Sequence, residues 1–190
     1  MKKIQSLAFV FITSLLAIAS CKKPEVNNPQ PVEQELITTV RLIVTNGSGF
    51  TRTFNYKVDN GFGSASPGNI QADTVILLPE TEYKAEIQVW NEAETPAENI
   101  TTEVLAESND HLFFLQSTPS SGHGSINFSN GSKDDAGEPL NQKVQFNTGA
   151  AGYGHLMITL KHKPVNKNAS LPDEAGGETD AQAEFTVTIQ

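Results

Sequence analysis

The sequence predicts an all-β fold, a two-sheet and mainly antiparallel β-sandwich of the immunoglobulin-like type, with about eight or nine strands and one short helix. Three observations predict it. Short segments of alternating apolar and polar residues recur along the chain, turn-forming Gly, Asn and Pro residues separate them, and helical periodicity is scarce. The chain of 190 residues has a single cysteine. No disulfide can therefore form within the chain, and packing alone has to stabilise the fold.

The start of the chain has the layout of an export signal. Lys2 and Lys3 precede an apolar stretch over residues 7–19, which is too short to be a stable transmembrane helix. Small residues then lead directly into Cys21, and this arrangement resembles the lipobox of bacterial lipoproteins. The resemblance implies that residues 1–20 are removed as a signal peptide and that a lipid is attached to Cys21. The alternative is an ordinary signal peptide followed by a coincidental cysteine.

Two further regions follow the signal. Residues 21–32 comprise the lipidated cysteine and a tether rich in Pro and Asn, which we expect to be extended. Residues 33–190 form a single β-sandwich domain.

The strands are predicted from alternation and from the turns between them. In the first strand, Val40, Leu42 and Val44 are expected to face inward, and the turn at residues 46–49 connects it to the second strand as a hairpin. The apolar residues 112–115 have no polar alternation and predict a central strand that is buried on both faces. The predicted strands cover residues 36–46, 51–58, 74–78, 83–90, 111–116, 125–129, 143–147, 156–162 and 183–189.

Residues 96–109 interrupt the β pattern. Ile100, Val104 and Leu105 follow Pro96 at helical spacing, which predicts a surface helix of two or three turns. An irregular strand that crosses between the sheets is the alternative. Residues 120–124 and 163–180 are predicted as loops.

Composition and motifs exclude several functions. The net charge of −9 argues against a nucleic acid partner, because phosphate binding requires clustered Lys and Arg. The chain has no nucleophile elbow, no His-Glu-x-x-His motif and no phosphate-binding loop. We therefore predict a protein that is not an enzyme and that has no cofactor.

The histidines do not predict a metal site by their spacing. His155 and His162 lie on one predicted strand but on opposite faces, and His123 lies in a Gly/Ser loop. His111 is expected at a strand edge, with a hydrogen bond to nearby backbone.

Calcium is the stronger metal alternative, since oxygen ligands are plentiful. The alternative to calcium binding is solvated acidic turns. The candidate ligands are Asp134, Asp135 and Glu138 in one turn, and Asp173, Glu174, Glu178 and Asp180 in the last loop.

Three aromatic residues are candidates for a glycan-binding platform. They are Tyr83, Trp90 and Tyr153. The alternative is that they pack in the core or at its rim.

Several segments resemble a group of small cell-envelope lipoproteins of Bacteroidota. They are residues 36–40, 90–92, 110–114, 177–180 and 185–189. The resemblance implies an envelope location and a β-rich fold, with no established activity. Surface-exported members of the group carry acidic residues after the lipidated cysteine. This chain has Lys22 and Lys23 there, so the resemblance implies the outer membrane with the domain facing the periplasm, and the cell surface is the alternative.

The same resemblance suggests a modification site. Asp73, Thr74 and Val75 are similar to an O-glycosylation acceptor in that group, with Thr74 as the modified residue. The alternative is an unmodified threonine that opens a strand.

These observations predict a lipid-anchored cell-envelope protein that is a non-enzymatic binding or structural module. Its partners would be the membrane, through the lipid on Cys21, and an envelope protein or a glycan. The alternative is a periplasmic protein that binds a ligand or a cation such as calcium through the acidic loops.

Overall fold

The computed structural model describes residues 35–122 and 124–190. The chain divides into two units, Met1–Val32 and Glu33–Gln190, and the described residues belong to the second unit. The predicted signal, the lipid attachment at Cys21, the tether and His123 lie outside the described residues.

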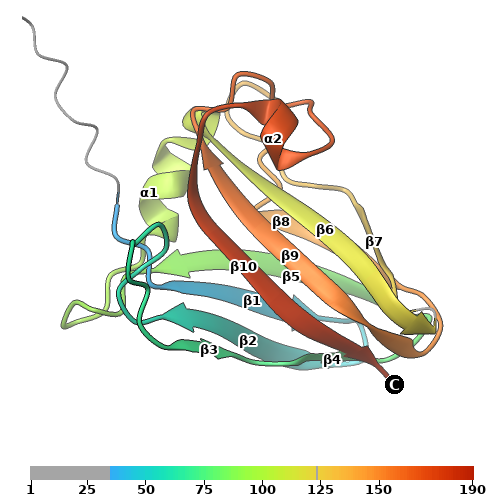
Figure 1. Cartoon of the computed structure of the whole chain (residues 1–190). Helices are drawn as coiled ribbons and strands as arrows, with labels where there is room; N and C mark the ends of the chain where they lie inside the picture. The colour runs from blue at the N-terminus through green and yellow to red at the C-terminus, as the bar shows by residue number, and fades with distance from the viewer. Residues whose placement is uncertain (1–34, 123) are drawn as a thin grey trace, which may run out of the picture. The chain divides into compact units, whose positions relative to one another are not determined.

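The domain is a two-sheet β-sandwich, and the predicted fold class is confirmed (Figure 1). Sheet A has six strands in the order β3-β2-β1-β5-β8-β7, and sheet B has four in the order β4-β10-β9-β6. Neighbouring strands are antiparallel, apart from the parallel pair β4 and β10. The strands are β1 Thr39–Thr45, β2 Thr51–Val58, β3 Ile70–Ala72, β4 Val75–Leu77, β5 Glu82–Trp90, β6 His111–Gly122, β7 Ile126–Ser129, β8 Lys143–Thr148, β9 Gly152–His162 and β10 Glu178–Ile189.

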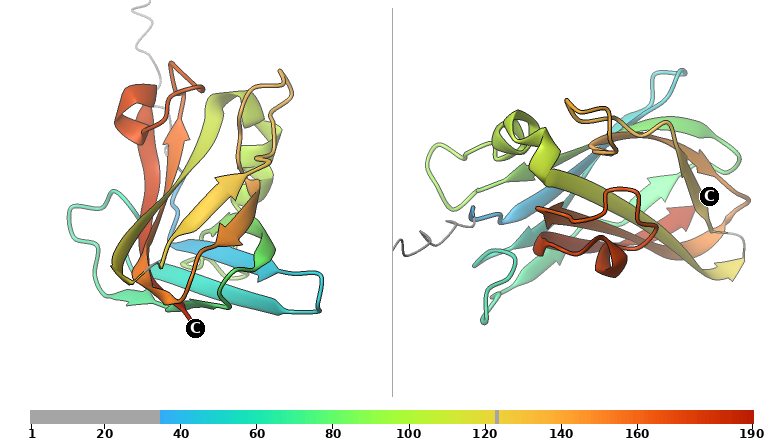
Figure 2. Two further views of the ribbon diagram at one scale, coloured as in Figure 1. Left: turned by 90° about the vertical axis from the view of Figure 1, so that its right-hand side faces the viewer. Right: turned by 90° about the horizontal axis from the view of Figure 1, so that it is seen from above.

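The core lies between the two sheets, which face each other as two layers (Figure 2). Alternate residues of each strand enter it, as the sequence predicts. Val40, Leu42 and Val44 of β1 are buried, and so are Leu156, Ile158 and Leu160 of β9. The largest fully buried side chains are aromatic, among them Phe113, Phe146 and Phe185.

The helical segments are shorter than predicted. Helix α1 covers Thr101–Ala106, and the 3-10 helix η1 covers Ser108–Asp110. The helix does not begin near Pro96, because Asn91 and Glu98 exchange two backbone hydrogen bonds of 3.0 and 2.9 Å and hold the intervening residues in a turn. A second short helix, α2 at Pro172–Ala175, lies in the segment predicted as a loop.

Helix α1 covers one end of sheet A. The hydroxyl of Thr101 accepts a 2.8 Å hydrogen bond from the amide of Val89 and donates one of 3.1 Å to its carbonyl oxygen. Ile100 and Val104 enter the core, whereas Leu105 is exposed. These contacts fix the position of the residues that follow α1.

Strand lengths and one strand position also differ from the prediction. Strands β6 and β10 extend into segments predicted as loops, and β9 begins four residues before the predicted strand. Each of the three continues the pairing of its neighbour over eleven or twelve residues. The sequence missed β3, because three residues are too few to show alternation.

Strand β6 is an edge strand, so the prediction of a central strand is wrong. Its residues are buried on both faces for another reason. Phe113 enters the core, while Leu112 and Phe114 on the opposite face pack against Ala169 and Ala175. The free edge is partly covered too, since the amide of Phe113 donates a 2.9 Å hydrogen bond to the carbonyl oxygen of Leu140.

Candidate metal centre

The connection from α1 to β6 holds a glutamate and a histidine close together. Glu107 ends α1, three residues of η1 follow, and His111 begins β6. The Glu107 carbonyl oxygen accepts hydrogen bonds from the amide of Asp110 at 2.9 Å and from Nδ1 of His111 at 3.0 Å. The prediction that His111 bonds to nearby backbone is confirmed. Because a carbonyl oxygen only accepts, Nδ1 carries a proton, and Nε2 of the neutral ring keeps its lone pair free for another partner.

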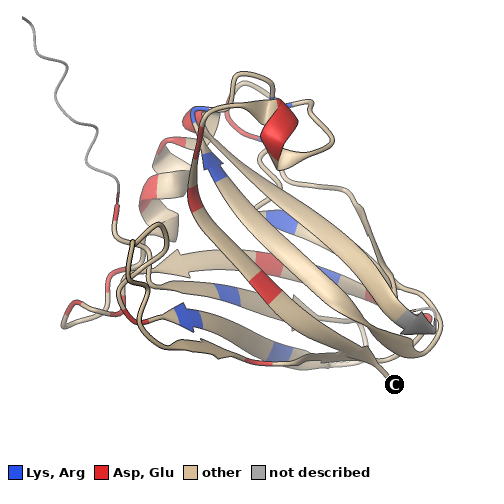
Figure 3. Ribbon diagram, in the orientation of Figure 1, with Lys and Arg blue, Asp and Glu red and all other residues tan. Residues whose placement is uncertain are grey.

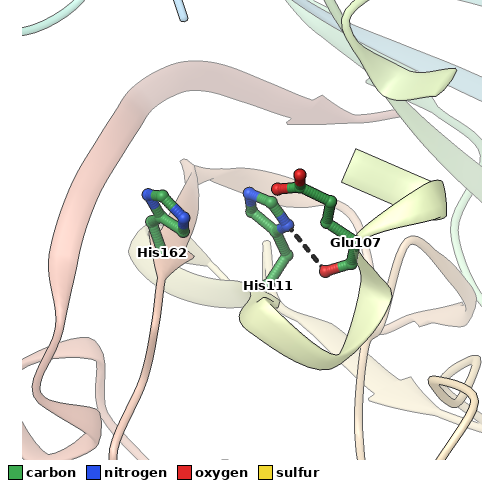
Figure 4. A group of neighbouring side chains, drawn as sticks. All are labelled: Glu107, His111 and His162. Atoms are coloured by element: carbon green, nitrogen blue, oxygen red, sulfur yellow. Dashed lines mark hydrogen bonds between the residues drawn. The ribbon is translucent and has the colours of Figure 1, made fainter. Parts of the chain in front are cut away.

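Strand pairing brings a second histidine to the same place. His162 ends β9 and is the direct partner of His111 in the antiparallel pair of β6 and β9. The two rings are stacked, with centroids 4.9 Å apart and planes inclined by 5°. Glu107, His111 and His162 lie next to one another, with the carboxylate of Glu107 beside the ring of His111 (Figure 4), and each offers one ligand atom within 4.8 Å of those of the other two.

A buried carboxylate on β10 lies against both histidines. Oδ2 of Asp180 is 3.9 Å from Nε2 of His111, and Oδ1 is 4.0 Å from Nδ1 of His162. The side chain of Asp180 is 8% exposed, and those of His111 and His162 are 5% and 13% exposed. We call these four residues, Glu107, His111, His162 and Asp180, the His-acid cluster.

The surroundings of the His-acid cluster are acidic, and Asp and Glu are drawn along α1, at the start of β10 and on α2 (Figure 3). Half-buried Glu35 has its pKa raised to about 8 by burial, by a hydrogen bond with Glu103 and by the negative charges of Glu103, Glu107 and Asp180. Among the described residues, no Lys or Arg forms an ion pair with Glu35, Glu103 or Glu107. A cation bound beside Glu103 and Glu107 would relieve the repulsion between these carboxylates.

The lowered pKa of His111 favours its neutral form, which is the form that binds a metal. Burial lowers the pKa of His111, and the neighbouring His162 lowers it further, while the backbone of Glu107 and the charge of Asp180 oppose the shift. A metal-binding histidine usually donates its other ring N–H to a carbonyl or a carboxylate, as His111 does to Glu107. Two imidazoles and nearby carboxylates are a donor set suited to Zn²⁺ and similar divalent transition metals.

The acidic residues predicted to bind calcium are not brought together. Asp134 instead accepts a 2.6 Å contact from Nζ of Lys167, and its other oxygen accepts the amides of Ala136 and Glu138. Asp135, Asp173, Glu174 and Glu178 are exposed. Asp180 is buried, as Asp134 is, but it lies against two histidines.

The prediction of an aromatic platform is wrong, because the three residues do not form one surface. Tyr83 is 1% exposed and accepts a 2.9 Å hydrogen bond from the amide of Leu78, so it belongs to the core. Trp90 lies at the other end of β5, half-buried beneath the guanidinium of Arg41, which is 4.7 Å from the ring centroid. Tyr153 is exposed on β9.

Two further predicted residues have defined places. Thr74 is exposed between β3 and β4, and the preceding Asp73 accepts a 2.7 Å hydrogen bond from the amide of Asn55. Its modification stays a prediction. His155 lies on the outer face of β9, opposite to His162 as predicted, with its Nδ1 3.7 Å from Glu184.

Sequence reasoning missed the His-acid cluster, although two signals were present. Glu107 and His111 are four residues apart at a boundary between a predicted helix and a strand. His111 begins one predicted strand and His162 ends another, so antiparallel pairing of the two strands in that register would place them side by side. The pairing itself could not be read from the sequence.

Comparisons provide no relative from which a function could be inferred. No protein-family model, no curated protein and no solved structure matches the chain. Within the described part of the chain, no helix is long and apolar enough to span a membrane.

Proposed function

We propose that the protein is a lipid-anchored cell-envelope protein whose β-sandwich binds a divalent transition-metal ion through Glu107, His111 and His162. The observation that carries the proposal is that ligand atoms of one buried histidine, one partly buried histidine and one exposed carboxylate lie within 4.8 Å of one another. These three side chains come from the end of α1, from β6 and from β9.

The donor set favours a transition metal over calcium. Calcium prefers six to eight oxygen ligands, whereas imidazole nitrogens favour Zn²⁺, Cu²⁺ or Ni²⁺. The acidic turn considered for calcium already has a cation, since Lys167 contacts Asp134. We therefore favour transition-metal binding over calcium binding for this protein.

The envelope location is supported by the sequence. Lys2 and Lys3, the apolar residues 7–19 and Cys21 together have the layout of a lipoprotein signal. A lipid on Cys21 would hold the domain at the outer membrane, and Lys22 and Lys23 favour the periplasmic side. We describe the protein as a binding module rather than an enzyme, and an envelope protein or a glycan remains the predicted partner.

Calorimetric titration of the purified full-length chain, stripped of metal with EDTA, tests the metal-binding function. We expect one Zn²⁺ per chain and a higher melting temperature with Zn²⁺, because a ligand that binds only the folded state stabilises it. Millimolar Ca²⁺ should leave the melting temperature unchanged.

Two histidine variants provide the specificity test. His162→Gln removes a ligand and should weaken Zn²⁺ binding by at least about 100-fold, which exceeds the usual cost of losing an outer-shell partner. His155→Gln is the matched control, because His155 also lies on β9 beside a carboxylate but is exposed on the outer face. Equal Zn²⁺ affinity in the two variants, or no binding by the unmodified protein, would contradict the proposal.

A further inference from the structure

Asp180 occupies an irregular position in β10. The pairing of β10 with β9 shifts between Thr179 and Ala181, so that Asp180 is the extra residue of a β-bulge. It is buried next to Ala181, which is also buried, whereas regular alternation would bury only one of two neighbours. Bulges occur next to functional sites because they redirect a side chain, and here the redirected side chain is a carboxylate.

The redirected carboxylate faces the nitrogens of both histidines. Its two oxygens lie 3.9 Å from Nε2 of His111 and 4.0 Å from Nδ1 of His162. Two donors of a tetrahedral Zn²⁺ with bonds of 2.0–2.1 Å lie about 3.3 Å apart. The two nitrogen–oxygen distances exceed this value by about 0.6 and 0.7 Å, and the stacked rings would also have to turn for their nitrogens to meet one ion together with Asp180.

We propose that Asp180 is the fourth ligand, and that Zn²⁺ is held with Glu107, His111 and His162 in a closed four-coordinate centre. This proposal depends on the proposed metal binding, and it adds the coordination number of the metal ion and the role of that ion. Structural zinc sites have four protein ligands, whereas catalytic sites keep one position for water or substrate. The metal then acts as a structural element that binds no substrate.

The positions of the four ligands explain what such a metal would stabilise. Glu107 follows α1, and His111, His162 and Asp180 belong to the neighbouring strands β6, β9 and β10. One ion would connect three strands of sheet B to the end of α1. In a domain without a disulfide, this link would take the place of a covalent crosslink.

Cobalt substitution in the full-length chain tests the role of Asp180. Four-coordinate tetrahedral Co²⁺ has strong visible absorption, and higher-coordinate Co²⁺ has weak absorption. We expect strong absorption in the unmodified protein and its loss in Asp180→Asn, together with a decrease in Zn²⁺ affinity of at least about 100-fold. Glu184→Gln removes an exposed carboxylate from the outer face of the same strand and should change neither the Co²⁺ absorption nor the Zn²⁺ affinity.

Asp180→Cys provides a test that does not depend on the stability of the Asn variant. A thiolate at position 180 that reaches Co²⁺ produces a sulfur-to-metal charge-transfer band in the near ultraviolet. The band should appear in this variant and be absent from the unmodified chain, which contains only Cys21.

The outcomes separate this inference from the proposed function. Zn²⁺ binding by the unmodified protein, with no charge-transfer band in Asp180→Cys or with an unchanged cobalt spectrum in Asp180→Asn, would overturn the role of Asp180 alone. No Zn²⁺ binding by the unmodified protein would overturn the proposed function and this inference with it.

Discussion

At the scale of single residues, one buried ion pair fixes the loop beside the His-acid cluster. Lys167 contacts Asp134 at 2.6 Å and also donates to the carbonyl oxygens of Ser108 and Asn109 at 2.9 and 3.3 Å. The side chain of Asp134 is 1% exposed and that of Lys167 is 11% exposed. Since Ser108 and Asn109 belong to η1, Lys167 connects the 163–177 segment to the residues between Glu107 and His111.

This ion pair predicts a specific dependence of stability on pH. Burial opposes ionisation of Asp134, but the contact with Lys167 and the amides of Glu138 and Ala136 outweigh it and lower its pKa below the ordinary value of 3.8. A carboxyl whose pKa is lowered by folding stabilises the protein above its unfolded pKa, and this contribution is lost as the pH falls through the folded pKa. The stabilisation should therefore be complete at neutral pH and disappear below pH 3.8.

Lys167→Met tests this dependence. It leaves Asp134 buried without its cation and should lower the melting temperature by several degrees at neutral pH. Well below pH 3.8 the difference from the unmodified protein should shrink, because Asp134 is then protonated in both. Lys133→Met is the control, because it removes a nearby lysine whose Nζ donates to the carbonyl oxygen of Gly137. A difference that stays constant with pH would contradict this account.

At the scale of elements, the turn into β10 is the feature on which the His-acid cluster depends. Gly177 has φ of +67°, a conformation that favours glycine. A Cβ atom at this position would collide with the carbonyl oxygens of His162 and Lys163. The close approach of the two strands therefore requires glycine three residues before Asp180.

Gly177→Ala should be destabilising for two reasons, the backbone conformation and the collision. The conformation alone costs about 1–3 kcal/mol. Gly63→Ala is the matched control, because Gly63 has φ of +76° with no atom within 4 Å of its would-be Cβ. We expect chemical denaturation to show a larger decrease in the free energy of unfolding for Gly177→Ala than for Gly63→Ala. Calorimetry should show weaker Zn²⁺ binding in Gly177→Ala only. Equal decreases in the free energy of unfolding would contradict this expectation, because the collision would then add nothing to the cost of the backbone conformation.

At the scale of the whole molecule, the proposed lipid anchor and the folded domain belong to different parts of the chain. The division between Val32 and Glu33 leaves Cys21 outside the β-sandwich unit. Each methylene buried in a bilayer contributes about 0.8 kcal/mol, and stable anchoring needs two acyl chains, which a lipid-modified cysteine supplies. The proposed anchor and the proposed metal centre should therefore be independent of each other.

Cys21→Ala tests this independence. We expect the variant either to appear in the soluble fraction of cells or to remain unprocessed, because it has no lipid attachment site. Its Zn²⁺ affinity should equal that of the unmodified protein. Membrane fractionation and mass measurement report the location and the processing of the variant, and calorimetry reports its Zn²⁺ affinity. A variant of mature size that still sediments with membranes would contradict the lipid anchor.

The sequence by itself determined the fold class, because the burial of a strand residue depends mainly on local alternation. Val40, Leu42 and Val44 are inward as predicted, and so are Phe185 and Val187 of β10. The same local reasoning placed His155 and His162 on opposite faces. It failed for residues 112–115, where burial on both faces indicated a central strand, because a covering segment with Ala169 and Ala175 produces the same pattern at an edge.

Only the tertiary structure decided which side chains meet. His111 and His162 are neighbours because β6 pairs with β9 in one register, and a slip of one residue would separate their faces. Asp180 joins them through a bulge, which local alternation cannot predict. The proposed anchor depends on consecutive residues that end at Cys21. The candidate metal centre is assembled from residues far apart in the chain, and their proximity depends on the pairing of whole strands.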